Sequence, residues 1–448
     1  MKKVLFIISL TVIAGGAGAQ TKEAAGYSFS VKQAIEFASQ NQHDIKNAAI
    51  DEDLAKQKVK EVLGMGMPQI NSSFDVKDFL EIPTSLIPAE FFGGRPGSYA
   101  AVKFGTQYQA TAGFDASQLL FSGDYLLGVM ASKVYVQLSA KASQRTHIET
   151  AVTVSKAYYT VLISEERMHL MDANIERIKK AMDDTKALLD NGFVEKIDFD
   201  RLTVTYNNLL IEQDNIQRLL KLGNYLLKYQ MGMDINAALV LTDKLADVKF
   251  DVAENVSAEK FDYSKRVEYD LFLTQFKLAE LDLKRNRFSY LPNAFAYGSL
   301  TGSAYRSQFD IFNSKTPWYP TALIGGKIVM PLFTGLQRNA KNQQAKLSLQ
   351  KAENNIDFIK KSIDLELMSS LTMLQNASIS LENQKKNIAV AEEVYRLSKL
   401  KYEQGIGSNI GMIEAQTALK ESQTNYNNAL YNAIEAKIDF DKANGNFK

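Results

Sequence analysis

The chain has 448 residues, with 52 basic and 51 acidic side chains, and 46% of the residues are hydrophobic. This near balance of charge argues against a nucleic-acid-binding protein, which usually carries a basic excess. Cysteine is absent, which excludes a disulfide framework, a thiolate metal site and a lipid-acceptor cysteine.

The N-terminus has the pattern of a secretory signal over residues 1–19. Lys2 and Lys3 precede a short apolar run, and Ala17-Gly18-Ala19 forms an Ala-x-Ala cleavage site. Removing this segment leaves 50 basic and 51 acidic residues, so the mature chain stays nearly neutral. No later apolar run reaches the roughly 18 residues of a membrane-spanning helix. We therefore expect an exported protein that is either soluble outside the inner membrane or inserted as a β-barrel.

The mature chain is an internal repeat. Leu120-Phe121-Ser122-Gly123 recurs 212 residues later as Leu332-Phe333-Thr334-Gly335, and Asn191-Gly192 recurs 213 residues later as Gln404-Gly405. A repeat on this scale predicts two structurally equivalent halves.

The offset sets the expected domain boundaries. Residues 20–232 form the first half and residues 263–445 the second, with a connecting region at 233–262 and a C-terminal tail at 446–448. Each half is predicted to contain one helix, two strands and a long helical hairpin.

The first half opens with a predicted helix. Ser30 stands at the N-cap and Gln33 completes a capping box. The helical period continues to about Leu63, where Gly64, Gly66 and Pro68 end it.

Two strands follow, at about 68–80 and 104–121. Even positions between 104 and 120 are mostly apolar, whereas odd positions include Gln107, Gln109 and Asp115. A soluble strand alternates too, but this run exceeds the 9–11 residues or so that a transmembrane strand needs, and it has a polar side. The segment between the strands, 83–99, is rich in Pro, Gly and Phe and is predicted to be an external loop.

The second half has its own strand pair, at about 290–302 and 319–333. In the latter, Ala322, Ile324 and Ile328 fall on one face, with Lys327 on the other. Lys327 corresponds to Asp115 in the repeat, so both are expected on the polar side. The segment 291–301 alternates poorly, and its two faces cannot be assigned from the pattern.

Two very long helices are predicted, at 122–190 and 335–402. Neither contains proline, and at 1.5 Å per residue each is about 100 Å long. Their distal parts carry apolar residues at intervals of seven, which is typical of a coiled-coil seam. These residues are Met168, Ile175, Met182 and Leu189 in the first copy and Leu381, Ile388, Tyr395 and Tyr402 in the second. After Gly192 and Gly405 a return helix follows with a matching seam.

No catalytic or cofactor motif can be assembled from the sequence. Gly325-Gly326-Lys327 lacks the upstream glycine and the Ser/Thr of a phosphate loop. The three histidines, His43, His147 and His169, are scattered without an i, i+4 partner. We therefore expect that the protein is not an enzyme and that it has no cofactor and no metal site.

Four stretches together resemble a known family. They are the opening helix Phe29–Ile35 with Asn41, the Leu-Pro and Met-Pro pairs at 291–292 and 67–68, the repeated Leu-Phe-Ser/Thr-Gly, and the segment from Tyr402 to Ser408 that continues to Gln416. In this order, over residues 28–445, they resemble TolC-type outer membrane efflux proteins.

The resemblance implies an α+β membrane protein that acts as a homotrimer. Each chain would give four strands to a 12-stranded β-barrel and its long helices to an α-helical tunnel in the periplasm. Such a protein lies in the outer membrane and extends into the periplasm, in contact with outer membrane lipid. It is the passive exit duct of a tripartite efflux or type I secretion system, with a periplasmic adaptor and an inner-membrane transporter as partners.

The resemblance also implies roles for particular residues. The helix tips would contact the adaptor, and the corresponding residues are Gly192, Phe193, Val194, Gly405, Ile406, Gly407 and Ser408. Asp198 and Glu414 are candidates for the periplasmic aperture, although Gly411 stands where an acidic residue is common. Asp115 and Lys327 would face the barrel lumen.

A second class of protein remains open on the sequence alone. A soluble periplasmic coiled-coil scaffold or adaptor would also carry a signal and heptads. It would not explain the membrane-length alternation of 104–120, nor the placement of strands between helices in both copies.

Overall fold

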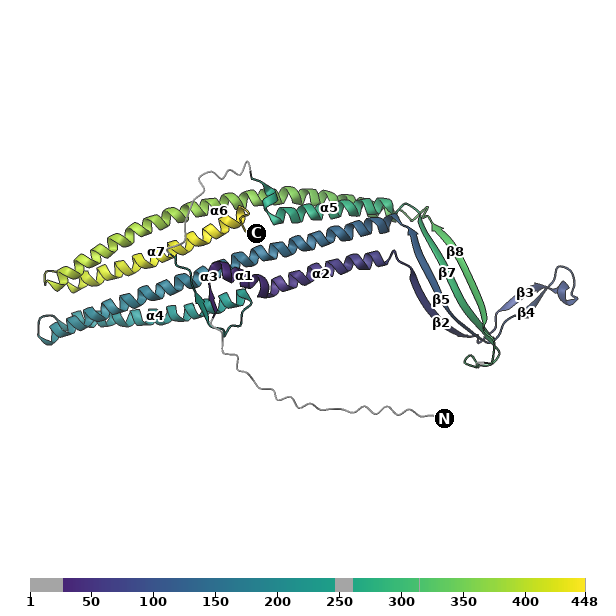
Figure 1. The fold of residues 1–448 in the computed structure, drawn as a ribbon, viewed down its shortest axis with the longest axis horizontal. Coiled ribbons are helices and arrows are strands. Elements are labelled where there is room, and N and C mark those ends of the chain that lie inside the picture. The colour runs from purple at the N-terminus through teal and green to yellow at the C-terminus, as the bar shows by residue number, and fades with distance from the viewer. Residues whose placement is uncertain (1–26, 246–260, 314, 448) are drawn as a thin grey trace, which may run out of the picture. The chain divides into compact units, whose positions relative to one another are not determined.

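The structure is a computed structural model that describes residues 27–245, 261–313 and 315–447 (Figure 1). The expected signal at 1–19 and half of the expected connecting region at 233–262 lie outside the described residues. The chain divides into two compact units. The first, which we call the tip unit, takes in the described parts of 1–42, 153–251 and 379–435; the second, the sheet unit, takes in those of 43–152, 252–378 and 436–448. This division cuts across the long helices, so the boundaries of the two sequence repeats stay a prediction.

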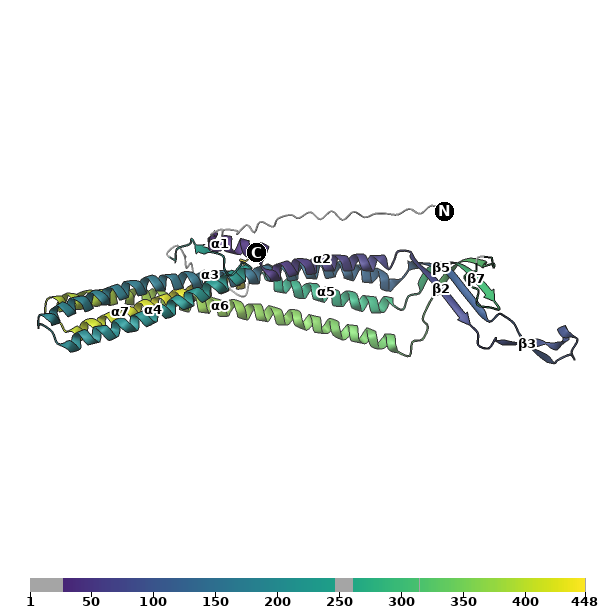
Figure 2. The same cartoon turned by 90° about the horizontal axis from the view of Figure 1, so that it is seen from below.

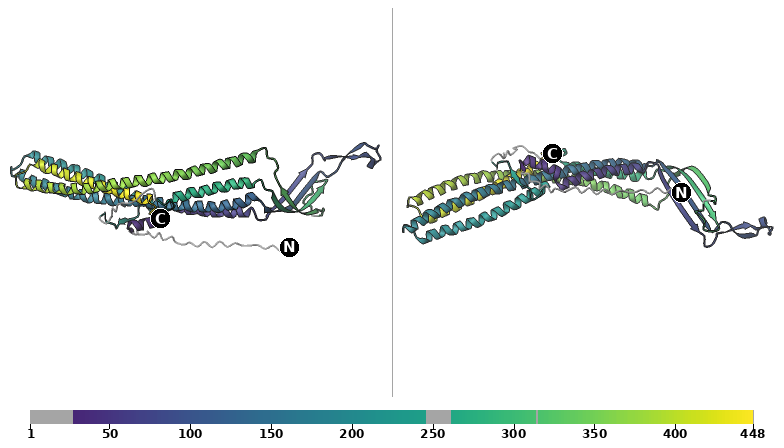
Figure 3. Two further views of the ribbon diagram at one scale, coloured as in Figure 1. Left: turned by 90° about the horizontal axis from the view of Figure 1, so that it is seen from above. Right: turned by 60° about the horizontal axis from the view of Figure 1, so that its bottom comes forward.

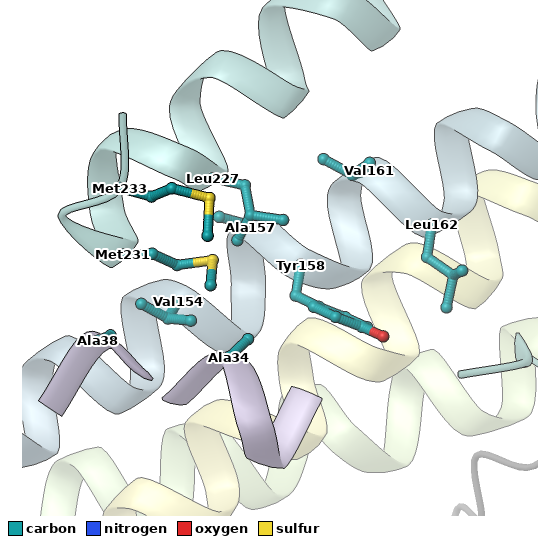
Figure 4. Packing of buried hydrophobic residues seen from close by; sticks show 10 residues of the cluster. All are labelled: Ala34, Ala38, Val154, Ala157, Tyr158, Val161, Leu162, Leu227, Met231 and Met233. Atoms are coloured by element: carbon teal, nitrogen blue, oxygen red, sulfur yellow. The ribbon is translucent and has the colours of Figure 1, made fainter. Parts of the chain in front are cut away.

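The tip unit begins with strand β1 (Tyr27–Phe29), which pairs in parallel with β6 (Leu239–Leu241). Helix α1 (Val31–Asn41) follows with the predicted capping box, in which the Ser30 backbone N–H donates to Gln33 Oε1 at 2.9 Å. Its buried Ala34 and Ala38 pack against a cluster from two longer helices (Figure 4). Within that cluster burial raises the pKa of Tyr158 to about 12. The cluster is completed by Val154, Ala157, Val161, Leu162, Leu227, Met231 and Met233.

The opening helix is shorter than its sequence pattern predicts. It ends at Asn41, Gln42 takes an extended conformation (φ −66°, ψ 138°), and α2 then runs over His43–Gly64. The cause is a close approach at Gly232, whose φ is +68°. A Cβ at Gly232 would lie 2.6 Å from the Asn41 carbonyl oxygen, so the backbones of the two segments are in direct contact. Sequence periodicity carries no information about such a long-range contact.

Four long helices carry the rest of the tip unit. They are α3 (Gly123–Asp190), α4 (Lys196–Met231), α6 (Gln337–Glu403) and α7 (Asn409–Ala443), and α3, α6 and α7 continue into the sheet unit. In the tip unit α3 lies beside α4, and α6 beside α7 (Figures 1 and 2). One hydrophobic cluster joins all four helices. Five of the predicted seam residues of α3 and α6 belong to it, namely Ile175, Met182, Ile388, Tyr395 and Tyr402. The return helices α4 and α7 contribute Leu202, Tyr206, Leu209, Ile216, Met412, Ala415 and Leu419.

The sheet unit is built on four antiparallel strands in the order β2-β5-β7-β8. Their bounds are Gln69–Asp78, Tyr108–Phe121, Asn293–Arg306 and Tyr319–Val329. Strand β5 starts four residues later than expected, because Gly105 has a φ of +129° that interrupts the extended run. Strand β8 stops before the expected residue 333, because Pro331 has no N–H to continue a ladder.

The segment expected to be an external loop contains structure. Strands β3 (Thr84–Pro88) and β4 (Tyr99–Lys103) pair as a separate hairpin, joined through the short helix η1 (Ala89–Phe92) (Figure 3). The Pro and Gly content that suggested a loop marks the turns of this hairpin.

The sheet unit also contains α5 (Val267–Phe288), preceded by the short helix η4 (Tyr263–Lys265). The end of α7 packs against α6 through Leu367, Leu374, Ala436 and Phe440. In the part of the chain that the structure describes, no helix is both long and apolar enough to pass through a bilayer.

Candidate functional site

The four-stranded sheet has one apolar and one polar face. Directly paired residues of antiparallel strands lie on the same face, so the register assigns every position. Even-numbered residues share one face in all four strands. That face carries Ile70, Phe74, Val76, Ala110, Ala112, Phe114, Leu300, Ala304, Ala322, Ile324 and Ile328. The opposite face is mostly polar and carries Asn71, Ser73, Asp75, Lys77, Gln109, Thr111, Asp115, Ser299, Thr301, Ser303, Thr321 and Lys327, together with Leu119, Phe295, Tyr297, Tyr305, Tyr319, Leu323 and Val329.

The register brings Asp115 and Lys327 to the same polar face. Asp115 pairs with Asn71 and Ser299, whereas Lys327 pairs with Phe295. The register also assigns β7, which the sequence pattern left open: Ser299, Thr301 and Ser303 lie on the polar face. The sequence hides this alternation because the apolar face of β7 carries mainly alanine and glycine, whereas the polar face also carries Phe295, Tyr297 and Tyr305.

Both helix tips are built on the same glycine turn. In the first, the Gly192 N–H donates to the Leu189 carbonyl and the Phe193 N–H to the Leu188 carbonyl, both at 2.9 Å. In the second, Gly405 and Ile406 make the same pair of bonds to Tyr402 and Lys401, both at 3.0 Å. This is the Schellman pattern, and it requires the left-handed φ of +78° at Gly192 and +73° at Gly405.

Each tip presents one large apolar side chain to solvent. Phe193 is 77% exposed and Ile406 is 74% exposed, although the residue at this position commonly folds back onto the helix end. Val194 is half-buried. A Cβ on Gly407 would lie 2.9 Å from the Tyr402 backbone nitrogen, so glycine is required there. Ser408 caps α7, because its Oγ accepts from the Gly411 N–H at 3.1 Å.

The two aperture candidates lie in different surroundings. Glu414 lines a groove of about 530 Å³ between α4 and α7, together with Asp200, Arg201, Ile410 and others. Asp198 does not line it; its carboxylate lies 3.8 Å from an Arg201 nitrogen instead. The acidic residue that shares the groove with Glu414 is Asp200, two residues after the predicted Asp198.

Polar contacts fasten the first helical hairpin to the second within the tip unit. The hydroxyls of Thr185 and Tyr402 are hydrogen-bonded at 2.9 Å, and Asn409 Nδ2 donates to the Asp198 carbonyl at 2.9 Å. Farther from the tips, Lys420 Nζ donates to Glu212 Oε2 at 2.6 Å. These contacts hold the two tips in a fixed relation.

Sequence reasoning missed a buried amide seam between α3 and α7. Asn174 Nδ2 donates to Gln423 Oε1, and Gln416 Nε2 donates to Asn174 Oδ1, both at 2.9 Å. All three side chains are buried. The signal was available, because Asn409, Gln416 and Gln423 follow one another at intervals of seven on α7. The apolar heptads repeat with the same spacing, so this polar repeat does not stand out in the sequence pattern.

Titratable groups in this region respond to burial rather than to a reactive partner. Burial raises the pKa of Tyr395, with the Arg177 guanidinium 5.9 Å from the ring centre acting in the opposite direction. Burial likewise raises the pKa of Glu165. Among the described residues, no group of three or more His, Cys, Asp or Glu side chains has a metal-binding arrangement.

Comparison with known proteins gives matches to outer membrane efflux proteins. Residues 297–446 match the family model described as "Outer membrane efflux protein". The chain is 24% identical to the probable efflux pump outer membrane protein TtgC of Pseudomonas putida, over 71% of this chain and 65% of the relative. It thus spans slightly less than two thirds of that relative's length. It is 21% identical to the outer membrane protein TolC of Escherichia coli, over 99% of this chain and 87% of the relative.

The fold has solved counterparts. The Campylobacter jejuni CmeC outer membrane channel superposes with a TM-score of 0.73 at 16% identity, covering 100% of this chain and 95% of that one. The open-state MtrE outer membrane channel of Neisseria gonorrhoeae gives 0.72 at 17% identity, covering 93% and 88%. The chain is therefore similar, in fold and over nearly its whole length in sequence, to TolC-type outer membrane efflux proteins, and the resemblance inferred from its repeated motifs is confirmed.

Proposed function

We propose that this protein is the outer membrane exit duct of a tripartite efflux or type I secretion system. It conducts substrates passively from a periplasmic adaptor and an inner-membrane transporter to the exterior. The observation that carries the proposal is the sheet, whose exposed apolar face and polar face suit lipid on one side and water on the other. A soluble periplasmic scaffold would leave this apolar face in water.

The sheet needs further copies of the chain. Within the described residues, β2 and β8 each pair along one edge only, and a membrane-embedded sheet must close on itself. Two copies would supply eight strands, which leave an interior just wide enough for side chains. Three copies supply twelve, which is the smallest closed set with an open lumen. Asp115 and Lys327 then face that lumen.

The helices offer a second contact between copies. On α4, the exposed Ile197, Val204 and Ile211 follow one another at intervals of seven, outside the cluster that joins the four helices. On α6, the exposed Val390 and Leu397 have the same spacing. Apolar residues at this spacing form coiled-coil seams, so each stripe fits the stripe of a neighbouring copy. Three copies packed in this way enclose an α-helical tunnel.

The trimer is tested by membrane fractionation of the mature chain followed by mass determination in detergent. We expect a trimer in the outer membrane fraction that dissociates on heating in detergent. A monomer or dimer free in the periplasm would remove the channel and leave a coiled-coil scaffold.

The exposed tips are the surface that we assign to the adaptor. Phe193 and Ile406 occupy equivalent positions of the two hairpins, so one binding mode fits both tips. Two grooves between the hairpins add concave surface near the tips: one of about 530 Å³ lies between α4 and α7, and one of about 370 Å³ lies mainly between α3 and α6. Asp198 and Glu414 are proposed to border the periplasmic aperture, with Asp200 beside Glu414.

Replacing both tip residues with serine should uncouple the duct from its adaptor. The double variant Phe193→Ser with Ile406→Ser removes two solvent-exposed apolar contacts and leaves the helix-ending hydrogen bonds intact. We expect an unchanged yield of trimer and loss of adaptor cross-linking, measured with a photo-crosslinker on a cysteine introduced at Val194. The matched control is Phe91→Ser, which removes an equally exposed aromatic in η1. Full adaptor cross-linking in the double variant would contradict the tip assignment.

The cargo follows from partners and not from this chain. The names of similar proteins include a toluene efflux pump component of Pseudomonas putida and a protease secretion protein of Dickeya chrysanthemi. Both small molecules and proteins are therefore candidate cargo.

A further inference from the structure

The connection between β7 and β8 does not extend away from the sheet. Residues 307–313, which we call the strap, fold back over the apolar face. Ile311 is only 2% exposed and forms a buried cluster with Ala110 and Ala304, which are paired neighbours on β5 and β7. Both alanines belong to the even-numbered, apolar face. The strap therefore lies on the face assigned to lipid and not on the face assigned to the lumen.

Small residues on the sheet make room for the strap. Ala110, Ala112, Gly302 and Ala304 form two adjacent pairs in the β5–β7 ladder. Ile311 covers one pair. Trp318, just before β8, packs against the other, since a Cβ on Gly302 would lie 3.4 Å from Trp318 Cε3. The same face carries Phe, Leu and Ile outside this patch, so the small residues and the covering side chains match in shape.

Two aromatic side chains of the strap point away from this patch and are exposed. Phe309 packs edge-on against Tyr108, with ring centres 5.5 Å apart, and is 63% exposed. Phe312 lies 6.4 Å from Phe74 and is 80% exposed. Phe74 is four residues inside the end of β2, which is roughly 13 Å along the strand. The strap thus extends the exposed apolar surface of the sheet at the end remote from α2 and α3.

An arginine beneath the strap explains why the strap stays docked. Arg306 is buried, although it lies on the apolar face as the partner of Tyr108. Its Nη2 donates to the Pro317 carbonyl at 2.9 Å, and its Nε lies 3.3 Å from Asp310 Oδ1. A guanidinium surrounded by hydrocarbon needs a counter-charge and hydrogen-bond acceptors. The strap and the residues that follow it supply both.

We propose that the strap and Trp318 form a lipid contact, in which Phe309, Phe312 and Trp318 insert among acyl chains near the headgroups of the outer leaflet. The proposal rests on the assignment of the apolar sheet face to lipid. It is favoured over a solvent-exposed loop by continuity with that face, and by the preference of aromatic rings for the membrane interface. Trp318 is the only tryptophan of the chain, which makes the contact directly measurable.

The test is quenching of tryptophan fluorescence by brominated lipid. The whole protein is reconstituted in vesicles of dioleoylphosphatidylcholine, or of analogues brominated near the headgroup or near the chain end. We expect Trp318 to lose most of its emission in the headgroup-proximal analogue and less in the chain-end analogue. Soluble acrylamide should quench it weakly.

Three variants in a Trp318→Phe background separate this inference from the proposed function. Phe312→Trp reports on the strap, Ile324→Trp on the apolar face of the sheet and Thr111→Trp on the polar face. We expect brominated lipid to quench the first two and to leave the third unchanged. If it quenches Ile324→Trp but neither Phe312→Trp nor wild-type Trp318, the strap lies in water and the inference fails while the barrel stands. If it does not quench Ile324→Trp, the sheet does not face lipid, and both fail.

If Phe312→Trp fails to assemble, quenching of Trp318 fluorescence in the wild-type protein still tests the proposal. Trp318 needs no substitution, and its quenching pattern is compared with that of Ile324→Trp. Stronger quenching of Trp318 by acrylamide than by headgroup-proximal bromine would overturn the inference.

Discussion

The variant Ile324→Lys should fail to form a trimer in membranes. Ile324 is 93% exposed on the apolar face of β8, so no packing within the chain is lost by its replacement. A lysine near the bilayer midplane costs about 2–4 kcal/mol. In a trimer the cost arises in each of three copies and amounts to about 6–12 kcal/mol, which is comparable to the whole stability of many proteins. We expect the heat-sensitive trimer band to disappear from the outer membrane fraction.

The matched control is Thr321→Lys on the same strand. Thr321 pairs with Thr301 and lies on the polar face, three residues from Ile324. Its lysine would face the aqueous lumen, where a charge is solvated, so we expect a normal amount of trimer. Phe114→Lys and Thr111→Lys make a second such pair on β5, with faces apolar and polar respectively, and Phe114 is 60% exposed. If both members of each pair assembled equally well, the sheet would not be embedded in lipid.

How much of the sheet the sequence predicts depends on its composition. In β5 the alternation of large apolar and polar residues predicts both the strand and its faces. In β7 the apolar face carries mostly alanine and glycine, whereas the polar face also carries aromatic residues, so only the register with β5 and β8 assigns the two faces. The strap is beyond sequence reasoning, because its contacts join Ile311 to residues of two separate strands. Alternation is a local signal, whereas docking of a loop on a sheet is not.

The helices show the same limit in another form. Heptad spacing predicts the seam residues that meet in the tip-unit cluster, because a period of 3.5 keeps one stripe on one side. It does not say which helix faces which stripe. The buried amides Gln416 and Gln423 follow the same spacing on α7, yet their partner Asn174 lies on α3 of the other hairpin. The tip glycines are predictable because a left-handed turn requires them, whereas the role of the tips as an adaptor contact stays a proposal.

Replacing Arg266 with alanine should have the largest effect on stability outside the barrel. Arg266 is 4% exposed and is the N-cap residue of α5. Its Nη2 donates to Glu366 at 2.7 Å, its Nε to Glu268 at 3.1 Å and its Nη1 to the Ala443 carbonyl at 3.0 Å. One guanidinium therefore joins the start of α5 to α6 and to the end of α7. Removing one partner of a fully buried ion pair costs about 3–5 kcal/mol. The side chains of Glu268 and Glu366 are 17% and 40% exposed, so water solvates part of the remaining charge and we expect a loss below that range.

The control is Arg396→Ala, which removes an arginine with two bonds to the exposed Glu393. Water replaces those bonds, so we expect no measurable change in melting temperature. Arg266→Lys keeps the charge but cannot reproduce the three hydrogen bonds of the guanidinium. Its melting temperature should lie between those of the wild type and Arg266→Ala. Melting is followed by the helical circular dichroism signal of the trimer in detergent. Equal melting of Arg266→Ala and wild type would show that the three contacts contribute nothing net.

The effect of Arg266 should also depend on pH. Burial alone would raise the pKa of Glu268, but the hydrogen bond and charge of Arg266 outweigh burial and lower it. A carboxyl with a lowered folded-state pKa adds stability above its unfolded pKa and loses that contribution as the pH falls through the folded value. Without Arg266, burial favours the protonated form of Glu268. Lowering the pH therefore reduces the destabilisation of the variant, whereas it lowers the stability of the wild type. The difference in melting temperature should therefore be largest near neutral pH and shrink on acidification to about pH 4, near the unperturbed pKa of glutamate.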